Sequence, residues 1–123
     1  MSKKRTLRVV NNTRQVTLIE HGRVADTFWT RLKGLMGVRR LALGDGLLIT
    51  PANQIHTHFM ATPVDVLYID ANHRLIDVDE ELSPWRIGRM RRGARYVIEA
   101  PCGLVAFSGS AAGDRFTIST NVG

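Results

Sequence analysis

The feature that most constrains the fold is a series of short β-branched and apolar runs, each ended by turn-forming residues. Runs of this length are typical of strands and too short for most helices. Residues 6–10 and 15–20 flank the turn-rich tripeptide "NNT" and predict a hairpin. A second hairpin is predicted around "DANH", residues 70–73, which turns the chain into a further strand. The strands of this second hairpin are predicted at residues 64–70 and 74–79, and further strands at residues 47–50, 55–60 and 95–101. "GDRFTIST", residues 113–120, supplies a turn and the last strand.

The segment "ADTFWTRLKGLMG" is the one convincing α-helix, over residues of about 27–36. Phe28, Leu32, Leu35 and Met36 recur at helical spacing, and Gly37 is a natural stop. "GLVAFSG", residues 103–109, predicts a single helical turn. We therefore expect a mainly β fold: a single-domain sandwich or partly open barrel of about eight short strands with one α-helix. An α+β arrangement is the alternative. No linker divides residues 1–123, so we expect one domain.

The chain is basic, with a net charge of +6 and 14 arginines among its 17 basic residues. This charge suits an acidic partner such as nucleic acid, a phosphate-bearing ligand or an anionic surface. Cys102 is the single cysteine, so an intrachain disulfide is excluded. The basic start lacks the apolar segment of a signal peptide, and no apolar run approaches the roughly 18 residues of a membrane span. We therefore expect a cytoplasmic protein without a membrane span.

Several segments together resemble one known family. They are "FWTRLKGLMG", "LALGDGLLI-P", "IHTHFM-TPVDVLYID", "PWR", and "VIEAPCG" leading to "GD". In this order, over residues 15–119, they resemble the domain of unknown function 192 family of bacteria and archaea. The resemblance implies a mostly β single domain with no assigned biochemical activity. His58 and Cys102 depart from the family pattern, where an aromatic residue and alanine are more usual, whereas His56, Asp65 and Trp85 match it.

The histidine pair in "IHTHFM" has the spacing of a metal site on a strand, because residues two apart share a face. His56, His58 and Met60 would lie on one face. A metal needs three or four ligands, however, and the last 50 residues contain no histidine. We therefore predict no metal and no cofactor.

Two carboxylates stand in strongly apolar strands and need partners if they are buried. Asp65 lies in "TPVDVLYID" and Glu99 in "YVIEAP". We expect Asp65 to pair with an arginine or to accept backbone N–H bonds, and we predict a structural ion pair between Arg31 and Glu99, with Asp65 as the other possible partner of Arg31. Cys102 has no adjacent base or cation in the sequence, which predicts an inert thiol.

The segment "WRIGRMRRGAR", residues 85–95, concentrates five arginines beside Trp85. Such a segment can bind single-stranded nucleic acid or another anionic ligand through stacking and guanidinium contacts. Alternatively, it is a solvated loop whose arginines balance "DVDEE", residues 77–81, on the adjoining hairpin.

These features support three functional hypotheses, and none identifies a reaction. The preferred one is a non-catalytic binding module for an anionic small molecule, glycan or protein segment, with a ligand-binding surface formed by His56, Thr57, Met60, Asp65, Trp85 and Arg86. The alternative is a hydrolase-like enzyme in which His56 acts as acid or base and Asp65 orients it. The third is nucleic-acid binding through the loop from Arg86 to Arg95.

Overall fold

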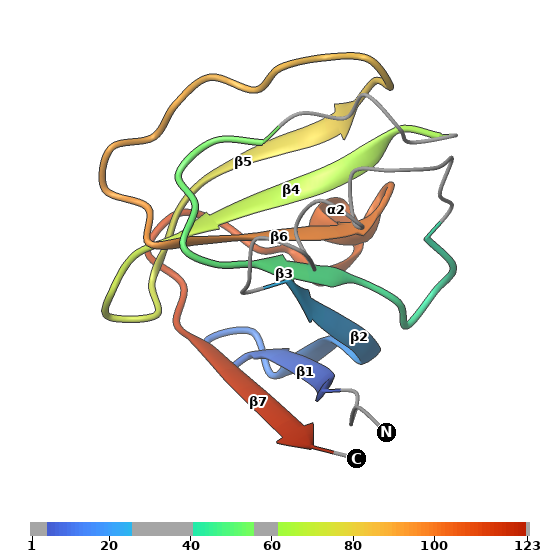
Figure 1. Cartoon of the computed structure of the whole chain (residues 1–123). Coiled ribbons are helices and arrows are strands. Elements are labelled where there is room, and N and C mark those ends of the chain that lie inside the picture. Colours follow the sequence, from blue (N-terminus) through green and yellow to red (C-terminus); the bar gives the residue numbers. More distant parts are fainter. Residues whose placement is uncertain (1–4, 26–40, 56–61, 123) are drawn as a thin grey trace.

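The structure is a computed structural model of the chain, and it describes residues 5–25, 41–55 and 62–122. These residues form one sheet and a short helix (Figure 1). With the labels of Figure 1, the elements are β1 (Arg5–Asn11), β2 (Val16–Ala25), β3 (Leu47–Ile49), β4 (Val64–Ile69), β5 (Leu75–Leu82), β6 (Tyr96–Pro101), α2 (Leu104–Ser108) and β7 (Phe116–Val122). The predicted mainly β class is confirmed.

The sheet has the order β5-β4-β6-β3-β2-β1-β7. Its neighbouring strands are antiparallel, except for the parallel pair β2 and β3. Strands β1–β2 and β4–β5 are the two predicted hairpins. In the second, the Asp70 side chain accepts the N–H groups of Asn72 and Arg74 at 2.8 and 3.0 Å, which fixes the turn.

The sheet curls until its two edge strands, β5 and β7, approach each other at one end (Figure 1). Arg74 and Arg115 form an antiparallel bridge there. Backbone bonds of 2.9 Å join Leu75 N–H to the Asp114 carbonyl and Phe116 N–H to the His73 carbonyl. The fold is therefore a partly open barrel, joined at one end and splayed at the other.

Two apolar clusters cover the two faces of the sheet. One, here called the α2 face, joins the inward residues of β1, β2, β6 and β4 to Leu104 and Val105 of α2. The other, here called the loop face, contains Leu47, Ile49, Val66, Tyr68 and Val97. All residues of β4 and β6 are buried because both faces of these strands are covered.

Helix α2 confirms the helical turn predicted in "GLVAFSG". Gly103 and Gly109 flank it with φ of 91° and 69°, a backbone conformation that favours glycine. A five-residue helix is not stable alone, so α2 depends on packing and on side-chain contacts from the sheet.

Two predicted elements lie outside the described residues: the helix at about 27–36 and, apart from Ile55, the strand at 55–60. Among the described residues, no helix has the length and apolar character needed to cross a membrane.

Candidate binding surface

Residues 83–95, here called the arginine loop, connect β5 to β6 and pass beside β5 (Figure 1). Backbone bonds hold this irregular segment in place. Gly88 N–H donates to the Ile55 carbonyl at 2.8 Å, and Arg91 N–H donates to the Asn53 carbonyl at 2.8 Å. Arg95 N–H donates to the Ile69 carbonyl at 2.7 Å. The loop is therefore fixed to the folded domain from Gly88 to Arg95.

Arg91 is the side chain that anchors the loop to the sheet. Its Nη1 and Nη2 bind Asp79 at 3.0 and 2.8 Å, and its Nε binds Asp77 at 2.9 Å. Its guanidinium carbon lies 4.0 Å from the centre of the Tyr68 ring, a cation–π contact. Only 9% of the side chain is exposed. The charge of Arg91 is thus balanced inside the domain and is not offered to a partner.

Tyr68 and Asp77 complete this anchor. Tyr68 Oη donates to Asp79 Oδ2 at 2.8 Å, and burial, followed by this hydrogen bond, raises the pKa of Tyr68 well above its ordinary value. Burial alone would raise the pKa of Asp77, but hydrogen bonds from Arg91 and the Val78 amide hold it below its ordinary value. Two acidic residues of the run at 77–81, Asp77 and Asp79, therefore balance Arg91, and Asp77 also pairs with Arg89. The second interpretation of the loop holds for these two arginines.

The loop also presents apolar side chains to solvent. Trp85, Ile87 and Met90 are 63%, 66% and 52% exposed. Arg86 and Arg92 on the same loop are exposed too, and the Arg92 side chain forms no hydrogen bond or ion pair with another described residue. We call Trp85, Arg86, Ile87, Met90 and Arg92 the loop patch. It combines large apolar groups with positive charge on a fixed backbone.

Asp65 lies on the other side of the sheet. It alternates with Val64 and Val66 of the loop face, so its side chain points to the α2 face. It is 0% exposed, and its two oxygens accept the N–H groups of Glu81 and Val105 at 2.9 and 2.8 Å. These bonds tie an irregular end of β5 and the start of α2 to β4. They give Asp65 the structural role of a carboxylate that accepts backbone N–H bonds.

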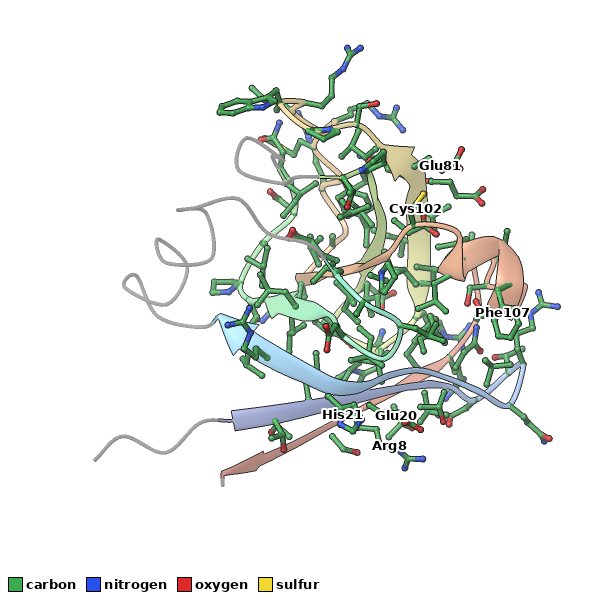
Figure 2. The ribbon with its side chains drawn as sticks, turned by 90° about the vertical axis from the view of Figure 1, so that its right-hand side faces the viewer. Arg8, Glu20, His21, Glu81, Cys102 and Phe107 are labelled. Carbon is green, nitrogen blue, oxygen red and sulfur yellow. The ribbon has the colours of Figure 1, made fainter. Side chains whose placement is uncertain are left out.

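Cys102 lies beside Glu81 and close to α2 (Figure 2). Its thiol is 3.7 Å from Glu81 Oε1. Desolvation, and then the negative charges of Asp65 and Glu81, raise the pKa of Cys102. A raised pKa disfavours the thiolate, so the thiol is chemically quiet at neutral pH.

The structure describes some of the other predicted site residues and not others. His56, Thr57, Met60 and Arg31 lie outside the described residues. Glu99 is 1% exposed and lies two residues after Val97 on β6, so its side chain shares the loop face with Val97. Its ion pair with Arg31 stays a prediction. Within residues 5–25, 41–55 and 62–122, no three histidine, cysteine or acidic side chains gather as a metal site.

One buried polar cluster has no counterpart among the predicted site residues. Asp114 is 4% exposed and its Oδ2 accepts hydrogen bonds from Asn11, Arg14 and the Ala111 amide at 2.9–3.0 Å. Asn11 also donates to Ser110 at 2.9 Å. The "GD" of the family-like pattern is the one signal that could have pointed to it. The cluster joins β1 to the turn before β7, which is a structural task.

Comparison with known proteins identifies the family of the chain. The model of DUF192, a family described as an uncharacterized ACR, matches residues 9–118. The chain belongs to this family. Among its relatives, the UPF0127 protein of Pyrococcus horikoshii is 38% identical over 102 residues, which is 78% of this chain and 85% of the relative. A UPF0127 protein of Thermococcus sibiricus is 27% identical over 110 residues, 86% and 71% of the two chains.

Two solved structures share the fold of this chain. A protein of unknown function from Novosphingobium aromaticivorans aligns with a TM-score of 0.74 and 19% identity, covering 90% of this chain and 82% of the other. A protein from Sinorhizobium meliloti, whose name proposes a transcription regulator, aligns with a TM-score of 0.76 and 24% identity over 95% of each chain. At these identities the likeness shows the fold alone. The family is described as uncharacterized, so membership assigns no activity to the chain.

Proposed function

We propose that this DUF192 protein is a non-catalytic binding module whose loop patch docks an acidic, partly apolar segment of another protein. The observation that carries the proposal is that Trp85, Ile87 and Met90 are each more than half exposed. The loop that carries them is held to the domain by backbone bonds of residues 88, 91 and 95. Monomeric proteins rarely leave several large apolar side chains together in water, and such groups commonly mark contact surfaces.

The composition of the patch favours a protein partner. Tryptophan, methionine and arginine are the residue types enriched at protein interfaces, and exposed arginines favour a partner with carboxylates. The net charge of +6 would speed the approach of such a partner.

The anchor beneath the patch supports the same proposal. Arg91 holds the loop against Asp77 and Asp79, so little loop entropy remains to be lost on docking. Asp65 is not included in this surface because it is buried on the opposite face. The hydrolase hypothesis, with His56 oriented by Asp65, gains no support from a carboxylate whose oxygens already accept backbone N–H groups.

The test is calorimetric titration of the full chain with a synthetic peptide of glutamates interspersed with leucines. We expect a dissociation constant on the order of 10 μM. Arg92→Glu should weaken binding about tenfold or more, roughly 1.4 kcal/mol, because it reverses a charge in the patch. Arg115→Glu is the matched control, since it makes the same charge change at an exposed arginine near β7, and it should alter affinity less than about threefold.

A second pair of variants tests the apolar contribution. Ile87→Ser should weaken binding, whereas Leu43→Ser, at a residue 85% exposed and outside the loop, should not. Equal effects of all four variants would contradict the proposal. Preference for a single-stranded oligonucleotide over the peptide, with affinity falling steeply as salt rises, would replace it with nucleic-acid binding.

A further inference from the structure

A separate hollow lies where the segment after β3 meets the segment before β6. It has a volume of about 300 Å³ and is lined by Pro51, Ala52, Asn53, Ala94 and Arg95. Its two walls are joined by backbone hydrogen bonds: Ala52 N–H donates to the Arg95 carbonyl at 3.0 Å, and Arg91 N–H donates to the Asn53 carbonyl at 2.8 Å. The hollow is therefore formed before any ligand arrives.

The lining has two kinds of chemistry. Pro51, Ala52 and Ala94 offer small apolar surfaces, whereas Asn53 and Arg95 carry hydrogen-bond donors. Arg95 is exposed and has no acidic side chain as a partner among the described residues. Asp77 and Asp79 on β5 are already bound by Arg91. Within the described part of the chain, Arg95 thus lines the hollow as an exposed cation that forms no salt bridge with an acidic side chain.

This combination selects the charge and shape of a ligand. A guanidinium presents a planar fork of donors that matches a carboxylate, and the Asn53 amide can donate a further bond. The apolar lining favours a short hydrocarbon or aromatic body beside the charged group. A volume near 300 Å³ is at the small end of ligand sites.

We propose that this hollow binds a small organic monocarboxylate, with the carboxylate on Arg95 and Asn53 and the apolar body against Pro51, Ala52 and Ala94. This site is independent of protein docking at the loop patch because it uses different residues and a different class of ligand.

The test is NMR titration of the full chain with benzoate, using benzamide as its uncharged analogue. We expect benzoate to shift the amide signals of Asn53, Ala94 and Arg95 saturably, with a dissociation constant on the order of 1 mM, and benzamide to leave them in place. Arg95→Gln should weaken benzoate binding at least about tenfold, because it removes the charge while the backbone bonds of the hollow remain.

Two further variants test whether the effect on benzoate binding is specific to the residues that line the hollow. Arg92→Gln removes an equal charge from the same loop and should change benzoate affinity less than about twofold. Asn53→Leu removes the amide donor, keeps the backbone carbonyl that Arg91 uses, and should weaken binding. Equal losses in Arg92→Gln and Arg95→Gln would overturn the proposal, as would benzamide binding as tightly as benzoate. Inorganic phosphate shifting the same amides with equal affinity would overturn the assignment of a carboxylate.

Discussion

Arg91 and Asp79 form a two-point ion pair, with nitrogen–oxygen distances of 2.8 and 3.0 Å, and this pair fixes the arginine loop to β5. Asp79 also accepts the Tyr68 hydroxyl, so the pair is part of a larger anchor. The apolar side chains of the loop patch are exposed on this anchored loop.

Arg91→Ala should lower the free energy of unfolding by about 2 kcal/mol. Breaking a fully buried pair costs about 3–5 kcal/mol, and partial exposure of Asp77 and Asp79 reduces this. Denaturant unfolding measures it. Arg89→Ala is the control: its side chain is 80% exposed and 3.4 Å from Asp77, so its effect should stay below about 0.5 kcal/mol. Similar losses in both variants would mean that Arg91 is not the anchor.

Gly88→Ala should destabilise the protein by about 1–3 kcal/mol because the new methyl group has no room. Its carbon would lie 2.7 Å from Tyr68 Oη and 3.2 Å from Asp79 Oδ2. The penalty should shrink in a Tyr68→Phe background, which removes the hydroxyl. Gly93→Ala is the control on the same loop, since its nearest neighbour would be Ile76 at 3.4 Å. Additive effects of Gly88→Ala and Tyr68→Phe would contradict the close approach.

Asp65→Asn should destabilise the protein by about 1–3 kcal/mol, because one buried N–H loses its acceptor. Amide hydrogen exchange should become faster at Glu81 and Val105, because their N–H groups donate hydrogen bonds to Asp65 in the parent protein. Asp45→Asn, at a half-buried turn carboxylate, is the control and should leave both amides unchanged. Unchanged exchange at Glu81 and Val105 in Asp65→Asn would remove the structural role.

Stability should fall in acid because of Asp114. Burial would raise the pKa of Asp114, but hydrogen bonds from Arg14 and Asn11 hold it below its ordinary value. A lowered folded pKa contributes stability above the unfolded value of about 4, and this contribution is lost as pH falls through the folded pKa. Melting temperatures measured from pH 6 down to pH 2 should therefore fall less in Asp114→Asn than in the parent. Parallel curves would contradict this.

Much of the fold follows from local sequence patterns. The hairpins could be predicted because β-branched runs meet at turn residues, such as Asp70, whose side chain closes the turn. The role of Asp65 followed from its apolar neighbours, since a buried carboxylate needs donors. The sequence did not decide between a sandwich and a barrel, so the approach of β5 to β7 could not be predicted. That approach depends on contacts between residues far apart in the chain, such as Arg74 and Arg115.

The candidate surface was predictable in part. The arginine-rich segment and its acidic counterpart are visible in the sequence, but Arg91 cannot be told apart there from Arg89 or Arg92. The choice is made by backbone bonds to distant residues, which turn Arg91 toward Asp77 and Asp79. The binding roles of His56, Thr57 and Met60, the ion pair between Arg31 and Glu99, and the cytoplasmic location stay predictions.

The loop patch is tested most directly by recording amide NMR spectra of the full chain with and without the glutamate–leucine peptide. We expect the largest shifts at residues 85–92, saturating together, and small shifts along β1 and β7. Shifts spread over all exposed arginines, or centred on the α2 face, would contradict docking at the loop patch.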